Sequence, residues 1–98
     1  MRMVNIIEKL RSHEDELRGR GVERLSVFGS VARGEAKSSS DVDLAVCFAP
    51  AAKIGLFAFA ALGERMGELL GVDVDLVSEP ARSLRMQREI DRDRVHVF

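Results

Sequence analysis

Apolar residues recur along the chain at two spacings, which together predict alternating helices and strands. A three-to-four-residue spacing predicts helices over residues 3–17, 53–70 and 78–90. Short apolar runs predict strands at residues 25–28, 41–48 and 72–77, and residues 95–98 are expected to form an edge strand. We therefore expect one α/β (α+β) domain over residues 1–98, with a small mixed sheet of three or four strands and about three helices.

A glycine–serine pair follows directly on the strand predicted at residues 25–28. A strand that ends in Gly29-Ser30 and turns into a short helix exposes backbone N–H groups and a hydroxyl, which are the groups that hold phosphate oxygens. Arg33 lies near this end and is interpreted either as a phosphate contact or as one half of a structural ion pair. Lys37, in the polar loop that follows, is interpreted either as a triphosphate contact or as a solvated lysine.

Two acidic pairs accompany the predicted strands at residues 41–48 and 72–77. Side chains alternate along a strand, so Asp41 and Asp43 point to the same face, about 7 Å apart. Carboxylates side by side repel each other and favour a cation between them, and a hard divalent ion with oxygen ligands is the simplest candidate. Asp73 and Asp75 share one face of the later strand in the same way. Phosphate-binding groups next to such carboxylates are what nucleotidyl transfer needs.

These residues resemble a known signature. Its elements are Gly29-Ser30, Arg33-Gly34, Ser40-Asp41 and Asp43-Leu44. Together they resemble the DNA polymerase beta nucleotidyltransferase superfamily. Within it, the short chain is similar to the minimal nucleotidyltransferases, the antitoxin halves of HEPN–nucleotidyltransferase toxin–antitoxin pairs. In the superfamily a third carboxylate comes from the strand beside Asp-x-Asp, and Asp75 matches that position best, with Asp73 as the alternative.

The resemblance implies a nucleotidyltransferase fold and an enzyme that moves AMP from ATP to a tyrosine hydroxyl of a partner HEPN toxin. It implies nucleotide binding by Gly29, Ser30, Arg33 and Ser40. Two Mg²⁺ ions and the chemistry would depend on Asp41, Asp43 and Asp75, with Asp75 orienting the attacking hydroxyl. Two alternatives stay open: a catalytically silent antitoxin that acts by binding alone, and a nucleotidyltransferase that modifies a small molecule.

Composition limits the partners and the compartment. Fifteen Lys and Arg residues against sixteen Asp and Glu residues give a net charge of −1, which argues against stable direct binding of nucleic acid. The apolar stretch 44–63 is interrupted by Pro50 and Lys53, so no membrane span is expected. The single cysteine, Cys47, fits a reducing cytoplasm. The chain contains no tyrosine, so an acceptor tyrosine would belong to another protein.

Two further features suggest external contacts. Phe57 falls off the apolar stripe of its predicted helix and is interpreted as a contact to something outside the chain. A basic stripe follows near the C-terminus, comprising Arg82, Arg85, Arg88 and Arg92. It fits an acidic partner or nucleotide phosphates, or else a solvated face balanced by neighbouring acids.

Overall fold

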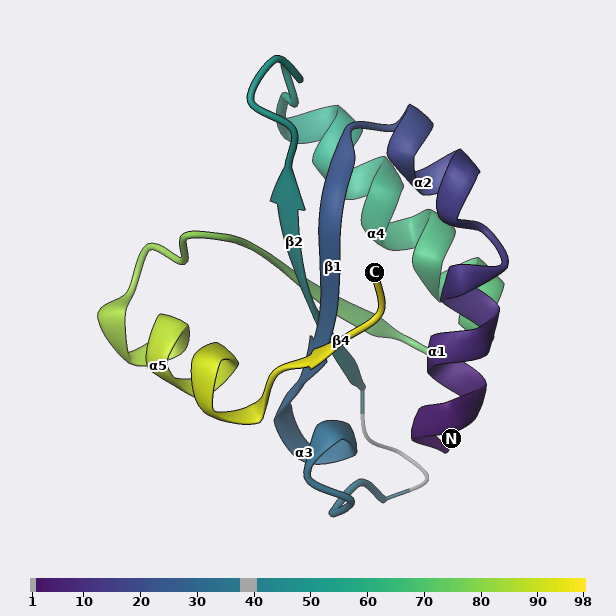
Figure 1. Ribbon diagram of the computed structural model, residues 1–98, viewed down its shortest axis with the longest axis vertical. Coiled ribbons are helices and arrows are strands. Elements are labelled where there is room, and N and C mark those ends of the chain that lie inside the picture. The colour runs from purple at the N-terminus through teal and green to yellow at the C-terminus, as the bar shows by residue number, and fades with distance from the viewer. Residues whose placement is uncertain (1, 38–40) are drawn as a thin grey trace.

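The computed structural model describes residues 2–37 and 41–98. The elements in chain order are α1 (Met3–Arg11), α2 (Glu14–Gly19), β1 (Val22–Phe28), α3 (Gly29–Ala32), β2 (Val42–Phe48), α4 (Leu56–Leu70), β3 (Val74–Ser78), α5 (Leu84–Asp93) and β4 (Val95–His96). The strands form one sheet in the order β3-β2-β1-β4 (Figure 1). β1 is antiparallel to β2 and β4, whereas β2 and β3 are parallel. The predicted mixed α/β fold is confirmed, and β4 is the expected edge strand.

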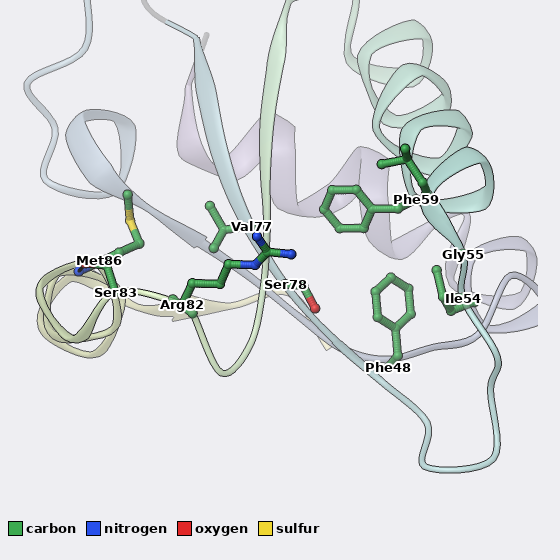
Figure 2. Close-up of a pocket in the computed structure, with 11 residues that line it drawn as sticks. Phe48, Ile54, Gly55, Phe59, Val77, Ser78, Arg82, Ser83 and Met86 are labelled. Atoms are coloured by element: carbon green, nitrogen blue, oxygen red, sulfur yellow. Dashed lines mark hydrogen bonds between the residues drawn. The ribbon is translucent and has the colours of Figure 1, made fainter.

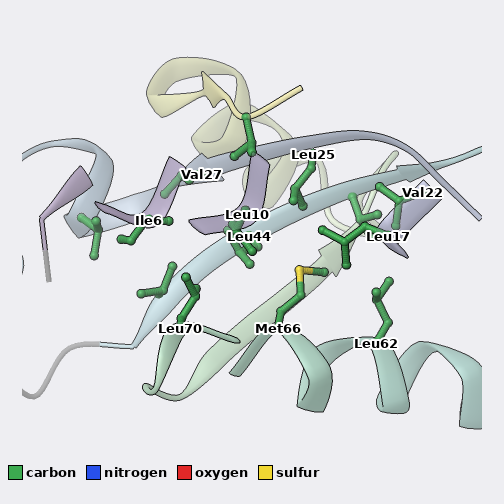
Figure 3. Close-up of a cluster of buried hydrophobic side chains, with 14 residues drawn as sticks. Ile6, Leu10, Leu17, Val22, Leu25, Val27, Leu44, Leu62, Met66 and Leu70 are labelled. Atoms are coloured by element: carbon green, nitrogen blue, oxygen red, sulfur yellow. The ribbon is translucent and has the colours of Figure 1, made fainter. Parts of the chain in front are cut away.

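The two faces of the sheet bury apolar clusters of different size. Alternation along β1 and β2 sends Leu25, Val27 and Leu44 to the face covered by α1, α2 and α4, where the larger cluster of buried side chains lies (Figure 3). The opposite face is covered by α5, through a smaller cluster of Phe28, Ala45 and Ile90 (Figure 1). The sequence correctly assigned Leu44 to the core. Asp43 lies on the α5 face, one residue away in the alternation.

The N-terminal helix is divided where a single helix was predicted. Ser12 Oγ donates to the carbonyl oxygen of Lys9 at 2.7 Å, and Nδ1 of His13 lies 2.9 Å from the same oxygen. The backbone N–H of His13 would bond that oxygen in an uninterrupted α-helix, but it donates to Leu10 instead, at 3.1 Å. Local side-chain bonds therefore end α1 and let α2 begin in a new direction. With this division and the one-turn α3, the described residues form five helices rather than about three.

The prediction that a helix begins at residues 78–80 was wrong. Ser78 is still part of β3 and pairs with Val46 of β2. α5 begins at Leu84, because Ser83 supplies the N-terminal cap by accepting a hydrogen bond from the backbone N–H of Met86 at 3.1 Å. Strand pairing thus takes residues that the local sequence assigns to a helix start. Among the described residues, no helix combines the length and the apolar character needed to cross a membrane.

An ion pair fixes the end of β3 to the C-terminal end of α5. The guanidinium of Arg94 donates to Glu79 through both terminal nitrogens, one of them at 3.0 Å, and also to Oγ of the buried Ser26 at 3.1 Å. Gln87 adds a hydrogen bond to Glu79 at 2.9 Å. The bond from Arg94 holds the pKa of Glu79 below its ordinary value of 4.5. The network therefore keeps α5 over its face of the sheet.

Replacing Glu79 with glutamine is expected to remove a pH-dependent part of the stability. A carboxyl whose folded-state pKa is depressed stabilises the fold above its ordinary pKa, and this contribution is lost as the pH falls through the folded-state value. At pH 7 we expect Glu79→Gln to cost about 1.5–3 kcal/mol of unfolding free energy, and the gap to wild type to shrink below about pH 4. Urea unfolding of both proteins at pH 7 and pH 3 measures this. An equal gap at both pH values would contradict the assignment.

Candidate active site

Two aspartates lie side by side on the α5 face of the sheet. Asp43 of β2 and Asp75 of β3 are register partners in the parallel pair, so their side chains leave the sheet in the same direction. Burial raises the pKa of Asp43, and the negative charges of Asp75 and then Asp41 raise it further. These two negative charges therefore oppose the ionisation of Asp43. An added cation would stabilise them in their charged form.

The turn after β1 brings backbone directly against Asp43. Gly29 begins α3 with a φ of +77°, a conformation that favours glycine. A Cβ atom at this position would lie 2.1 Å from Oδ2 of Asp43, far inside contact distance. Asp43 pairs with Phe28, the last residue of β1, so the approach follows from the strand register. The glycine–serine turn and Asp43 thus lie against each other.

The turn, the two aspartates and α5 surround a small hollow of about 300 Å³. The residues that line it are Phe28, Gly29, Ser30, Arg33, Asp43, Asp75, Val77, Met86, Glu89 and Arg92. Carboxylates and a hydroxyl lie at the strand ends, and arginines are contributed by α5 and the residue that follows α3. A hollow with this lining can receive a ligand that carries both phosphate groups and a cation.

Two arginines at this hollow are joined through one carboxylate. Asp93, at the end of α5, accepts from Arg33 at 2.7 Å and from Arg92 at 2.9 and 3.1 Å. Its side chain is only 4% exposed, and its bond to Arg92, followed by that to Arg33, lowers its pKa to about 2. Arg33 also pairs with Glu35 at 3.0 Å. Arg33 therefore makes the ion pair that the sequence allowed and also lines the hollow.

Some predicted site residues lie elsewhere. Asp41 precedes β2 and lines a neighbouring hollow with Asp73, although its charge still acts on Asp43. Asp75, and not Asp73, is the register partner of Asp43, which favours Asp75 as the third carboxylate. Ser40 lies outside the described residues. Within residues 2–37 and 41–98, no three His, Cys, Asp or Glu side chains are already arranged around a metal position.

Sequence reasoning did not assign Glu89, Met86 or Asp93 to the site, and it counted Arg92 only as the last member of the basic stripe. All four belong to α5. Met86, Glu89 and Arg92 line the hollow, and they reach it only because the helix folds back over β1. Of the remaining stripe, Arg85 pairs weakly with Glu89 at 3.7 Å and Arg82 lines a separate groove. The helical spacing of the arginines indicated a basic helix face, but it did not indicate which arginine would line the hollow.

Sequence comparison supports this interpretation. The profile of the nucleotidyltransferase domain family matches residues 6–96. The protein adenylyltransferase MntA of Thermococcus cleftensis is 42% identical over 89 residues, which cover 90% of this chain and 88% of MntA.

Solved structures share the fold. A crystal structure of a toxin–antitoxin with AMP-PNP aligns with a TM-score of 0.76 at 23% identity, over 94% of this chain and 72% of that one. The structure of a tri-AMPylated Shewanella oneidensis HEPN toxin in complex with MNT antitoxin aligns with a TM-score of 0.65 at 21% identity, over 90% of this chain and 68% of that one.

Gly29→Ala is expected to damage both the fold and the site, and Gly34→Ala provides a matched control. Both glycines have positive φ, +77° and +73°, but a Cβ at Gly34 would meet no atom within 4 Å. Gly34→Ala should cost only the backbone strain, about 1–2 kcal/mol. Gly29→Ala should cost about 2–5 kcal/mol, because Asp43 must also move. Urea unfolding of both variants measures the difference, and equal losses would show that Asp43 does not lie against Gly29.

Proposed function

Because the chain belongs to the nucleotidyltransferase domain family, we propose that it transfers AMP from ATP to a hydroxyl of a partner HEPN toxin and thereby acts as its antitoxin. The observation that carries this proposal is the register pairing of Asp43 with Asp75 beside the turn at Gly29. The adenylyltransferase relative supports AMP as the transferred group. The solved complex with an AMPylated HEPN toxin supports a protein acceptor of this class.

The triphosphate of ATP would lie over the glycine–serine turn. The Ser30 hydroxyl and the backbone N–H groups of the turn donate to phosphate oxygens. Arg33 and Arg92 supply positive charge at the same hollow, held there by Asp93. Ser40, which the resemblance includes, would be a further nucleotide contact. This placement brings the α-phosphate toward the aspartate pair.

The aspartates have the chemistry of a magnesium site. Their donors are all carboxylate oxygens, the ligands that Mg²⁺ prefers, and the raised pKa of Asp43 marks a carboxylate that a cation would stabilise. Asp43 and Asp75, with Asp41 at the start of β2, would hold the two ions. When bound, such ions neutralise triphosphate charge and lower the pKa of the attacking hydroxyl.

The transfer is an in-line displacement. The acceptor oxygen forms a bond to the α-phosphorus while the bond to the pyrophosphate oxygen breaks, and Asp75 accepts the hydroxyl proton. The chain has no tyrosine, so a tyrosine acceptor must come from the partner. We place the reaction in the cytoplasm, where ATP is supplied, and treat residues 1–98 as the one catalytic domain.

Asp43→Asn and Asp75→Asn are each expected to lower AMP transfer at least about 100-fold, because each removes a charge that the transition state needs. Asp73→Asn is the matched control, since Asp73 comes just before β3 and lines the other hollow, and it should retain most activity. The measurement is incorporation of label from α-labelled ATP, with Mg²⁺, into the product of the adjacent reading frame. Full labelling by Asp43→Asn would refute the proposal. An unlabelled partner that is still inhibited by both variants would indicate an antitoxin that acts by binding alone.

Asp93→Asn tests the positioning of the two arginines. With one bonding oxygen replaced by an amide, Arg33 and Arg92 lose their fixed directions, so we expect KM for ATP to rise about 5- to 30-fold with a smaller change in kcat. Glu35→Gln is the control, because the exposed Glu35 carboxylate is hydrogen-bonded to Arg33 and, within the described part of the chain, not to Arg92. Steady-state kinetics of both variants decide the point. Equal effects on KM from the two substitutions would show that Asp93 does not position the pair.

A further inference from the structure

We propose that an apolar groove next to the active site docks the acceptor protein, through an amphipathic helix of that partner whose apolar face is flanked by Asp or Glu. The inference rests on the proposed function and deepens it by assigning the partner a surface. The groove has a volume of about 680 Å³ and lies between β3, the start of α4 and the start of α5 (Figure 2). Its side walls include Phe48, Ile54, Leu56, Phe59, Val77 and Met86.

The groove exposes large apolar side chains that this chain does not cover. Leu56, at the first position of α4, is 79% exposed. The rings of Phe48 and Phe59 meet edge to face, with centroids 6.2 Å apart, and form one wall (Figure 2). Phe57, which the sequence suggested as an external contact, is 89% exposed on the same turn of α4. Apolar residues gathered in this way mark a protein-binding surface.

The groove and the active-site hollow share two lining residues. Val77 of β3 and Met86 of α5 line both cavities. Val77 is two residues from Asp75, so both side chains leave β3 on the same face. A partner segment in the groove would therefore pass near the carboxylate that is proposed to accept the hydroxyl proton. This position lets a docked partner present its acceptor hydroxyl to the site.

The charge around the groove favours an acidic partner. Arg82 is the one charged residue among those found to line it (Figure 2). Two further cationic residues, Arg85 and Lys53, are exposed. Each is the sequence neighbour of a lining residue, Met86 and Ile54 respectively. Apolar walls with a cationic edge match an amphipathic helix that carries carboxylates beside its apolar stripe. The residues that line the active-site hollow do not include Phe57, Arg82 or Arg85.

The test combines two groove variants with one control. Leu56→Asp removes an exposed apolar contact and Arg82→Glu reverses the cationic edge, and neither residue belongs to the buried core. Val4→Asp is the control, because Val4 is an exposed apolar residue (53%) on α1 that does not line the groove. The readouts are affinity for the product of the adjacent reading frame by calorimetry, ATP affinity, thermal melting and the oligomeric state of the chain alone.

We expect each groove variant to weaken partner binding at least about 10-fold and to slow its AMPylation, while ATP affinity and melting temperature stay at wild-type values and Val4→Asp changes nothing.

Wild-type partner affinity in both variants, with AMP transfer intact, would overturn the groove assignment and leave the proposed function standing. A partner that binds wild type and loses affinity for the variants, but is never AMPylated, would support the groove and refute the transferase function. If Leu56→Asp instead converts a dimer of this chain to monomers without altering partner affinity, the groove is a self-interface and the proposal is wrong. Failure of the wild type to bind the partner at all would refute both.

Discussion

The contact between the Asp43 carboxylate and the backbone at Gly29 is the constraint on which the site depends. Burial of a carboxylate is unfavourable, and this one is also next to Asp75, so nothing in the local chemistry of β2 would hold it there. The strand register does so instead. Phe28 pairs with Asp43 and Asp43 with Asp75, which fixes the three strand ends relative to one another. The missing side chain at residue 29 then leaves room for the oxygen.

The energy that maintains this register comes from the opposite face of the sheet. Leu25, Val27 and Leu44 alternate with the site residues along β1 and β2, and they are fully buried beneath α1, α2 and α4. Asp43 is therefore covalently next to Val42 and Leu44, which belong to the core. The α5 face is covered by a single helix, whose smaller cluster is supplemented by the Glu79–Arg94 ion pair. Most of the buried apolar side chains therefore lie on one face, and the candidate site lies on the other.

Features set by local sequence patterns could be predicted, and features set by long-range contacts could not. The alternation of Val42 and Leu44 with Asp43 is a local pattern, so the strand, its buried face and the acidic face could be read directly. The turn at Gly29 is likewise local. Asp93 reaches Arg33 across 60 residues, and no periodicity reports such a contact. The start of α5 was misplaced because pairing of Ser78 with Val46 is a tertiary effect that overrides the helix-start signal at Pro80.

The placement of the arginines explains why the acidic and basic halves of the site do not neutralise each other. Arg33 is bonded to Asp93 and Glu35, and it lowers the pKa of Asp43 less than Asp75 and Asp41 each raise it. An arginine bonded directly to Asp43 would satisfy that carboxylate and remove its need for a cation. Asp93, and not Asp43, accepts the hydrogen bonds of the Arg33 and Arg92 guanidinium groups. The negative charge at the strand ends thus stays available for metal ions while the positive charge at α5 stays available for phosphates, and this separation is what a metal–triphosphate substrate requires of a nucleotidyltransferase.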